Sequence, residues 1–280
     1  ENCIHFEEVV FLPDFELCFD TDSKTRKGGV LNIRKSLGCV TEAGLFSSTS
    51  EGLELLRKKE GHPFKYQEVE VVALKSNGNE IRALTYIVPS NKTKGFVKPH
   101  PDYLKVCKDG FNSRGMDDSD LITAAKGEKV EPRSALFTYG TLMRDENRYH
   151  VIKDSSVKCA LMAQCGGTLS TNGHYPALNL AEGGISWGDY FVSDNIVSLL
   201  ERTDQIEGFV GFGSVKNLFR RTYVPVDVGR LRYAWTYVMD KKLDFDIQAN
   251  DWRTYCGNRL RFIGDIYRSH SETTTNFEER

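Results

Sequence analysis

The sequence lacks several features that would assign it to a particular class of protein. Among its 280 residues no apolar run approaches the ~18 residues of a membrane span, and the first residues carry no signal-peptide pattern. The formal net charge is only −2, so no strong basic field attracts nucleic acid. We therefore expect a protein with neither a membrane nor a nucleic acid as its partner.

Cysteine and histidine are scattered along the chain. The seven cysteines include no Cys-x-x-Cys pair, and an odd, dispersed set is typical of reduced thiols in a cytoplasmic compartment. The six histidines show no metal-ligand spacing. The sequence thus predicts a cytoplasmic location, no disulfide framework and no metal site.

What the sequence does contain is an internal repeat. Four segments recur in one order at offsets of 147 to 151 positions: 29–33 with 176–180, 53–61 with 199–208, 83–88 with 234–239, and 102–107 with 251–256. This offset is far longer than the ~20–50 residues of a solenoid repeat. The chain length suits two domains of ~100–150 residues each. We predict two copies of one domain, at 1–115 and 135–280, joined by a linker at 116–134 that is rich in Gly, Asp, Ser and Lys.

Each copy is expected to be mostly β-strand with a few short helices. Residues 68–74 and 82–88 are β-branched and aromatic, and the Asn77-Gly78 pair between them favours a hairpin turn. Residues 222–228 and 231–238 repeat the pattern around Gly229. These patterns predict an α+β fold in which each sheet curls toward a barrel.

A glutamate ends a short amphipathic helix in each copy. In the second copy Ile196, Leu199, Leu200, Thr203 and Glu207 recur with helical spacing. Eleven steps of ~100° bring the last of them to within about 20° of the first, on the apolar side. Helix caps are expected at Ser193 or Asp194, at Ser48 with Glu51 in a capping box, and at the closing Gly61 and Gly208.

Two interpretations of these glutamates, Glu60 and Glu207, stay open. Burial would raise the pKa of the carboxyl group, because desolvation disfavours its charged form, and such a group suits proton transfer. Alternatively, the helix end frays and the carboxylate reaches water or pairs with a neighbouring Arg or Lys. Because the glutamate-glycine pair occurs in both copies, the functional interpretation gains weight.

The segment 136–143 is an apolar strand that runs into a turn at Gly140. Successive backbone N–H groups in such a turn can converge on an anion such as a carboxylate. Strands that end in a glycine turn are common, so this motif alone does not identify a function. The loop at 208–213 is glycine-rich but follows a helix, which favours a pocket rim with two phenylalanines over a phosphate loop.

Together these motifs resemble the gamma-glutamylcyclotransferase-like family. The resemblance covers residues 135–257, where Tyr139-Gly140-Thr141-Leu142, Tyr175-Pro176, 188–192, Glu207-Gly208 and 234–238 follow in the order that the family shows. Residues 10–111 resemble the same family, but the Tyr-Gly strand is missing, and its position would fall before Glu1. Either the chain has been trimmed, with the lost piece bound as a separate N-terminal peptide of the same precursor, or the first copy is degenerate.

The resemblance implies a fold, a reaction and a set of site residues. It implies two copies of a mixed β-barrel domain with short helices. It also implies that the α-amine of a small gamma-glutamyl substrate attacks the γ-carbonyl, releasing 5-oxoproline and a free amine without a cofactor. The implied catalytic residues are Glu207 and its equivalent Glu60, and the implied substrate-binding residues are Tyr139, Gly140, Thr141, Leu142 and Tyr66.

One residue departs from the family pattern. Phe219 stands where the family often has a tyrosine, which removes one hydroxyl from the expected pocket wall. The alternative to an enzyme is a non-catalytic protein that kept the fold and binds a small ligand or acts as a scaffold.

Overall fold

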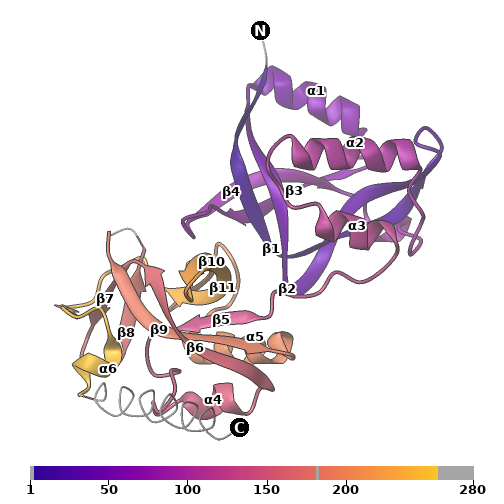
Figure 1. The fold of residues 1–280 in the computed structure, drawn as a ribbon. Coiled ribbons are helices and arrows are strands. Elements are labelled where there is room, and N and C mark those ends of the chain that lie inside the picture. Colours follow the sequence, from indigo (N-terminus) through magenta and orange to yellow (C-terminus); the bar gives the residue numbers. More distant parts are fainter. Residues whose placement is uncertain (1–2, 181–182, 258–280) are drawn as a thin grey trace, which may run out of the picture.

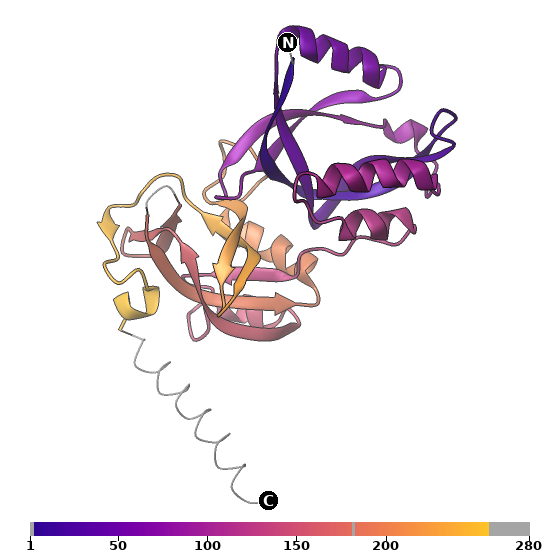
Figure 2. The same ribbon diagram turned by 45° about the horizontal axis from the view of Figure 1, so that its top comes forward.

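The computed structural model describes residues 3–180 and 183–257, which form two halves that lie side by side (Figures 1 and 2). The first half contains one sheet of four strands in the order β2-β1-β3-β4, with helices packed around it. Its elements are β1 (Ile4–Ser23), β2 (Gly28–Ser48), α1 (Ser50–Glu60), β3 (Gln67–Leu74), β4 (Glu80–Ile87), the 3-10 turn Ser90–Lys92, α2 (Pro101–Asn112) and α3 (Ser119–Ala125).

The second half contains a closed barrel in the order β10-β11-β5-β9-β6 and a small sheet in the order β12-β7-β8. Its elements are β5 (Ala135–Thr138), α4 (Tyr149–Lys153), β6 (Val157–Gly166), β7 (Thr168–Thr171), β8 (Pro176–Asn179), β9 (Ile185–Ser193), α5 (Ile196–Glu207), β10 (Arg220–Asp227), β11 (Leu231–Val238), β12 (Phe245–Asp246) and α6 (Trp252–Tyr255). The expected α+β class with few helices is confirmed, and the expected barrel forms in the second half, whereas the described strands of the first half form an open sheet. No helix in these described ranges is both long and apolar enough to cross a bilayer.

Both predicted hairpins form. β3 pairs with β4 around the Asn77-Gly78 turn, where the N–H of Lys75 donates to the carbonyl of Asn79 over 2.9 Å. β10 pairs with β11 in continuous register around Gly229. Both amphipathic helices also form, and they end at left-handed glycines, Gly61 with φ 67° and Gly208 with φ 63°.

The predicted helix N-caps were wrong by one or two residues. Thr49, not Ser48, caps α1, and Asn195, not Ser193 or Asp194, caps α5. Ser48 and Ser193 are the last residues of β2 and β9. Their hydroxyls are already used there, because Ser48 donates to the Cys3 carbonyl and Ser193 to the Ser155 carbonyl.

Residues 116–134 do not hang free between the halves. Within them α3 packs on β1, and Leu121 and Ala124 are buried against Leu17 and Phe19. The segment that follows α3 reaches the second half along β2, where the N–H of Arg133 donates to the Gly38 carbonyl over 2.8 Å.

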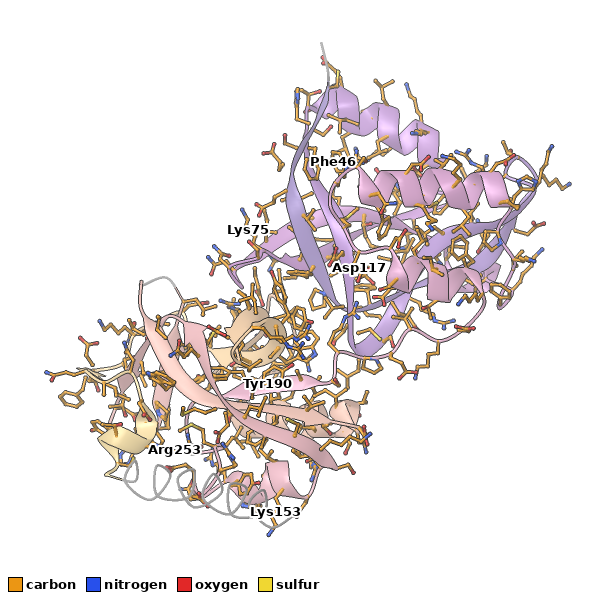
Figure 3. The ribbon with its side chains drawn as sticks, in the orientation of Figure 1. Phe46, Lys75, Asp117, Lys153, Tyr190 and Arg253 are labelled. Atoms are coloured by element: carbon orange, nitrogen blue, oxygen red, sulfur yellow. The ribbon has the colours of Figure 1, made fainter. Side chains whose placement is uncertain are left out.

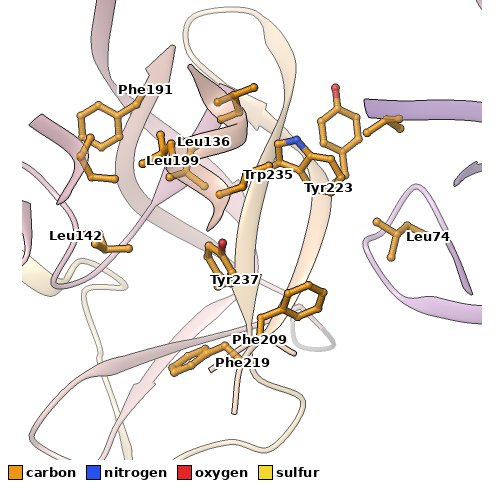
Figure 4. Close-up of a cluster of buried hydrophobic side chains, with 14 of the residues drawn as sticks. Leu74, Leu136, Leu142, Phe191, Leu199, Phe209, Phe219, Tyr223, Trp235 and Tyr237 are labelled. Carbon is orange, nitrogen blue, oxygen red and sulfur yellow. The ribbon is translucent and has the colours of Figure 1, made fainter. Parts of the chain in front are cut away.

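One hydrophobic core runs across the boundary between the halves. Phe11 and Leu74 of the first half join the cluster that contains Tyr223 and Trp235 of the second, and Figure 4 shows Leu74 approaching from the neighbouring strands. The ring of Phe11 meets the ring of Tyr223 edge-on, with 5.5 Å between centroids. The turn between β3 and β4 adds polar contacts, since Arg220 and Thr222 both donate to the carbonyl of Gly78.

A buried arginine lies at the centre of this boundary. Arg221, on β10, is 0% exposed and forms ion pairs with Asp14 of the first half and with Asp204 of α5. Asp14 reaches it from a register shift in the β1–β2 pairing, where its φ is 58°. The guanidinium also lies against the rings of Phe209, Phe212 and Trp235, within 5.2 Å of each centroid.

We predict that Arg221→Met strongly destabilises the protein. The substitution leaves two sheltered carboxylates without their shared cation, a loss that typically costs about 3–5 kcal/mol. The free energy of unfolding, measured with urea, should fall by about that amount. Arg230→Met, at an exposed position of the same hairpin, is the matched control and should change it by less than about 0.5 kcal/mol. Equal losses in the two variants would contradict the role assigned to Arg221.

Candidate active site

Helix α5 carries Glu207 to the edge of a cavity in the second half. Leu199, Leu200 and Thr203 are fully buried on one side of the helix, as the sequence predicts. Their burial fixes the rotation of α5, so that Glu207, one turn after Thr203, lines the cavity wall. Gly208 then turns the chain away into the following loop.

The turn that follows β5 also lines this cavity. Gly140 lies so close to Pro176 that a Cβ atom on Gly140 would stand 2.5 Å from the Pro176 Cγ. The carbonyl of Gly140 accepts from the N–H of Met143, which closes the turn. The N–H groups of Gly140, Thr141 and Leu142 have no acceptor among the residues that the structure describes. They are therefore available to an anion in the cavity.

The cavity has a volume of about 100 Å³. A water molecule takes ~30 Å³ of liquid, so the space holds a few waters or one small polar group. The remaining part of a larger ligand would have to extend out of the cavity. The residues that line it are Phe137, Thr138, Tyr139, Gly140, Thr141, Leu142, Arg148, Tyr175, Pro176, Ile206, Glu207, Leu218, Phe219 and Tyr237. Figure 4 shows three of these residues, Leu142, Phe219 and Tyr237, as labelled side chains.

Burial makes Glu207 an unusual acid. Desolvation raises the pKa of its carboxyl group from 4.5 to about 7, and the positive charge of Arg148 opposes this rise. The pKa of Tyr139 is also raised, first by burial and then by the negative charge of Glu207. The Tyr139 hydroxyl donates to the carbonyl of Tyr237 over 2.7 Å, so that ring is held in place.

A carboxyl group with a pKa of about 7 can both take and return a proton near neutral pH. It is partly ionised there, whereas an ordinary glutamate is almost wholly ionised. The same cavity is lined by a turn whose main-chain donors suit a carboxylate or a developing oxyanion. In the described part of the chain no group of three or more His, Cys, Asp or Glu side chains is placed to hold a metal ion.

The structure brings together five of the seven residues implied by the sequence resemblance. Tyr139, Gly140, Thr141, Leu142 and Glu207 line one cavity. Glu60 and Tyr66 lie elsewhere, in the first half, where burial and the charge of Glu60 raise the pKa of Tyr66.

The 208–213 loop, predicted to be a pocket rim, lines a second cavity together with residues of the first half and does not line the cavity that holds Glu207. Its two phenylalanines, Phe209 and Phe212, pack on each other and on the Arg221 guanidinium. Phe219, in contrast, does line the cavity, and its ring meets Tyr175 edge-on at 5.8 Å.

Sequence reasoning missed Arg148 and gave no site role to Tyr175, Ile206 or Tyr237. Arg148 reaches the cavity because the chain folds back after the turn, and its N–H donates to the Thr141 carbonyl over 2.9 Å. No periodic pattern surrounds it, so the sequence carries no local signal for this return. Tyr175 and Tyr237 do lie in the quoted motifs: Tyr175 directly precedes β8, Tyr237 lies on β11, and both line the cavity.

Known proteins show a clear relationship to this half of the chain. The profile of the family described as gamma-glutamyl cyclotransferase, AIG2-like, matches residues 136–254. The gamma-L-glutamyl-butirosin B gamma-glutamyl cyclotransferase of Niallia circulans is 31% identical over 121 residues, which cover 43% of this chain and 76% of that protein. The chain belongs to this family. The resemblance expected for residues 135–257 is thereby confirmed.

Two solved structures are similar in part. A gamma-glutamyl cyclotransferase is 25% identical, with a TM-score of 0.39, over 46% of this chain and 76% of the other. An uncharacterized protein from Homo sapiens is 26% identical, with a TM-score of 0.39, over the same shares of both chains. Membership of the family rests on the sequence relationship, and at the level of the family it implies an enzyme.

We predict that Glu207 makes the protein less stable as the pH rises from about 4.5 to 7. Between these values the folded protein keeps a proton that the unfolded chain has released, so stability falls with rising pH. The full loss is roughly 3 kcal/mol, from a shift of two to three pKa units. Glu207→Gln removes this loss, so the variant should be more stable than the wild type at pH 8 and similar to it below pH 4.5. Denaturant unfolding across pH measures this, and a constant difference between the two proteins would contradict it.

Proposed function

We propose that this protein is a gamma-glutamyl cyclotransferase that cleaves a gamma-glutamyl amide and releases 5-oxoproline. The observation that carries the proposal is the carboxyl group of Glu207, with a pKa of about 7, in the lining of the same cavity as the Gly140 turn. Membership of the family supports the reaction class. The cavity volume suits the glutamyl end of the substrate, and the leaving group would project outward.

Binding would use the main chain of the turn and one cation. The N–H groups of Gly140, Thr141 and Leu142, which line the cavity, would hold the substrate α-carboxylate. Arg148, on the same wall and close enough to Glu207 to lower its pKa, adds positive charge. These contacts would bend the glutamyl chain so that its α-nitrogen approaches its own γ-carbon, which is the main gain in an intramolecular reaction.

Glu207 would then move the protons. Its carboxylate takes a proton from the α-ammonium group, and the freed amine attacks the γ-carbonyl carbon to form the new C–N bond. As the tetrahedral intermediate collapses, the carboxyl group gives its proton to the leaving nitrogen and the amide C–N bond breaks. The ring nitrogen then loses its second hydrogen as a proton, which the released amine takes up to become an ammonium group. The products are 5-oxoproline and a free amine or amino acid, and Glu207 ends in its starting state.

We also propose that the two halves are copies of one domain. The order of elements supports this. In the first half β1 corresponds to β6 with β7, β2 to β8 with β9, and α1 to α5. After these, β3 corresponds to β10, β4 to β11 and α2 to α6. The sheet order β2-β1-β3-β4 equals the barrel order β9-β6-β10-β11 with β5 removed. Among the described residues of the first half no counterpart of the Gly140 turn lies near Glu60, and we assign the reaction to Glu207. All seven cysteines are free thiols, which supports a cytoplasmic location.

We expect Glu207→Gln to abolish most 5-oxoproline release. The amide has the shape of the acid but cannot carry the proton, so kcat should fall by roughly 10²- to 10⁴-fold. Release is measured by chromatography across a panel of gamma-glutamyl amino acids and amines. Glu201→Gln, on the exposed side of α5, is the control and should keep the wild-type rate. If the Glu207 variant also kept it, the mechanism would be wrong.

Gly140→Ala should mainly weaken substrate binding. The added methyl group meets Pro176, so the turn must shift and its N–H groups leave their positions. We expect KM to rise at least about tenfold, in line with the loss of a charge-assisted hydrogen bond worth ~1.5–3 kcal/mol. Gly166→Ala, at a glycine with open space around it, is the control. An unchanged KM in Gly140→Ala would remove the turn from substrate binding.

A further inference from the structure

The second cavity lies between the two halves of the molecule. Its volume is about 540 Å³, within the ~300–1,000 Å³ that is typical of small-molecule sites. Residues 13–15, 33–35 and 69–72 of the first half line it, together with the loop that follows α5 in the second half. Among the described residues the two cavities share no lining residue, so this space is separate from the one that holds Glu207.

The pairing of the strands explains why this space exists. β1 pairs with β3 only at Phe11 with Leu74, and next to that pair β1 shifts register between Pro13 and Phe15 and continues along β2. On the other side the loop after α5 reaches the β3–β4 hairpin, where the N–H of Gly213 donates to Glu80 over 3.1 Å. Figure 3 shows Lys75 directly after β3, at the end of this hairpin that lies beside the second half. The cavity is thus closed by contacts from both halves.

Much of the cavity wall is apolar, and it is held from behind. Phe15 and Val71 belong to the hydrophobic core of the first half. Phe209 and Phe212, in the second half, rest on the Arg221 guanidinium. An apolar group placed here would leave water without requiring the wall to rearrange, and both effects favour binding.

Most charged groups in the lining already have partners. Arg34 forms an ion pair with Glu16 over 2.7 Å, and Arg82 forms one with Glu70 over 2.5 Å. The carboxylate of Asp14, which also lines the cavity, is paired with Arg221 outside it. A cationic ligand would therefore have to compete with an arginine for every carboxylate in the lining.

Lys35 is the exception. Its Nζ atom lies 3.9 Å from the centroid of the Phe15 ring, and it forms no ion pair with any residue that the structure describes. Burial lowers the pKa of Lys35, and the negative charge of Asp14 opposes this effect. An ammonium group that has lost part of its water and has no counter-ion is suited to receive an anion.

We propose that this cavity binds a small carboxylate with an apolar body. The Lys35 ammonium group would donate a hydrogen bond to the carboxylate, and the body would pack against Val71 and the rings of Phe15 and Phe209. The ligand would contact both halves and strengthen their association. This proposal concerns binding alone and does not depend on the proposed reaction.

The test uses the full chain and two probes of the same shape, 2-naphthoate and the uncharged 2-naphthamide. Isothermal titration calorimetry should show a single site for 2-naphthoate and at least about tenfold weaker binding of 2-naphthamide, because the amide forms no charge-assisted hydrogen bond. The comparison separates the contribution of the charge from that of the apolar body.

A variant tests the same contact from the side of the protein. Lys35→Met removes the charge and keeps an unbranched side chain of similar length, so the affinity for 2-naphthoate should fall at least about tenfold and that for 2-naphthamide should not change. Lys24→Met is the matched control, because Lys24 is exposed in the same half and lies outside the lining. It should bind both probes as the wild type does.

Hydrogen exchange of the backbone amides locates the bound probe. Saturating 2-naphthoate should slow exchange at 69–72 and 209–213 and leave 139–142, the turn beside Glu207, unchanged. Three results would overturn the proposal: no saturable binding at millimolar 2-naphthoate, equal loss of affinity for both probes or for neither in Lys35→Met, and protection at 139–142 in place of the other two segments.

Discussion

The arrangement of the molecule depends on one buried cation. Arg221 has no exposed surface, so it needs compensating charge, and it draws one carboxylate from each half. Asp14 ties it to the first half, and Asp204 ties it to α5, three residues before Glu207. Asp204 in turn accepts a hydrogen bond from Tyr237, whose ring lines the cavity. The contact that joins the halves is therefore also a contact that positions the cavity walls.

The chemistry depends on how thoroughly one carboxyl group is removed from water. Glu207 and Glu60 both end an amphipathic helix before a left-handed glycine. Glu207 shares a cavity with the turn that follows β5, and among the described residues the sheet of the first half has no strand in the corresponding position. The same local sequence thus yields two environments, and the difference comes from a strand that is distant along the chain.

The sequence predicted the local elements well and the long-range ones poorly. Hairpins around Gly78 and Gly229 and the helices that end at Glu60 and Glu207 follow from periodicity and turn residues, which act over a few positions. The N-caps were misplaced because Ser48 and Ser193 already serve the preceding strands and their neighbours. The position of Arg148 in the cavity depends on the return of a chain segment after the turn, which no local pattern encodes. The packing of Phe209 and Phe212 on Arg221 likewise depends on segments that are apart in the sequence.

The bulge at Asp14 has a consequence for how the sequence can change over time. Its carboxylate and Arg221 are separated by 207 positions, yet each shelters the charge of the other. A neutral residue at position 14 would leave the guanidinium with one carboxylate instead of two, and selection would then favour a matching change on β10. Substitutions in the two halves are therefore coupled, because a change at one partner of this ion pair limits which residues the other position can accept.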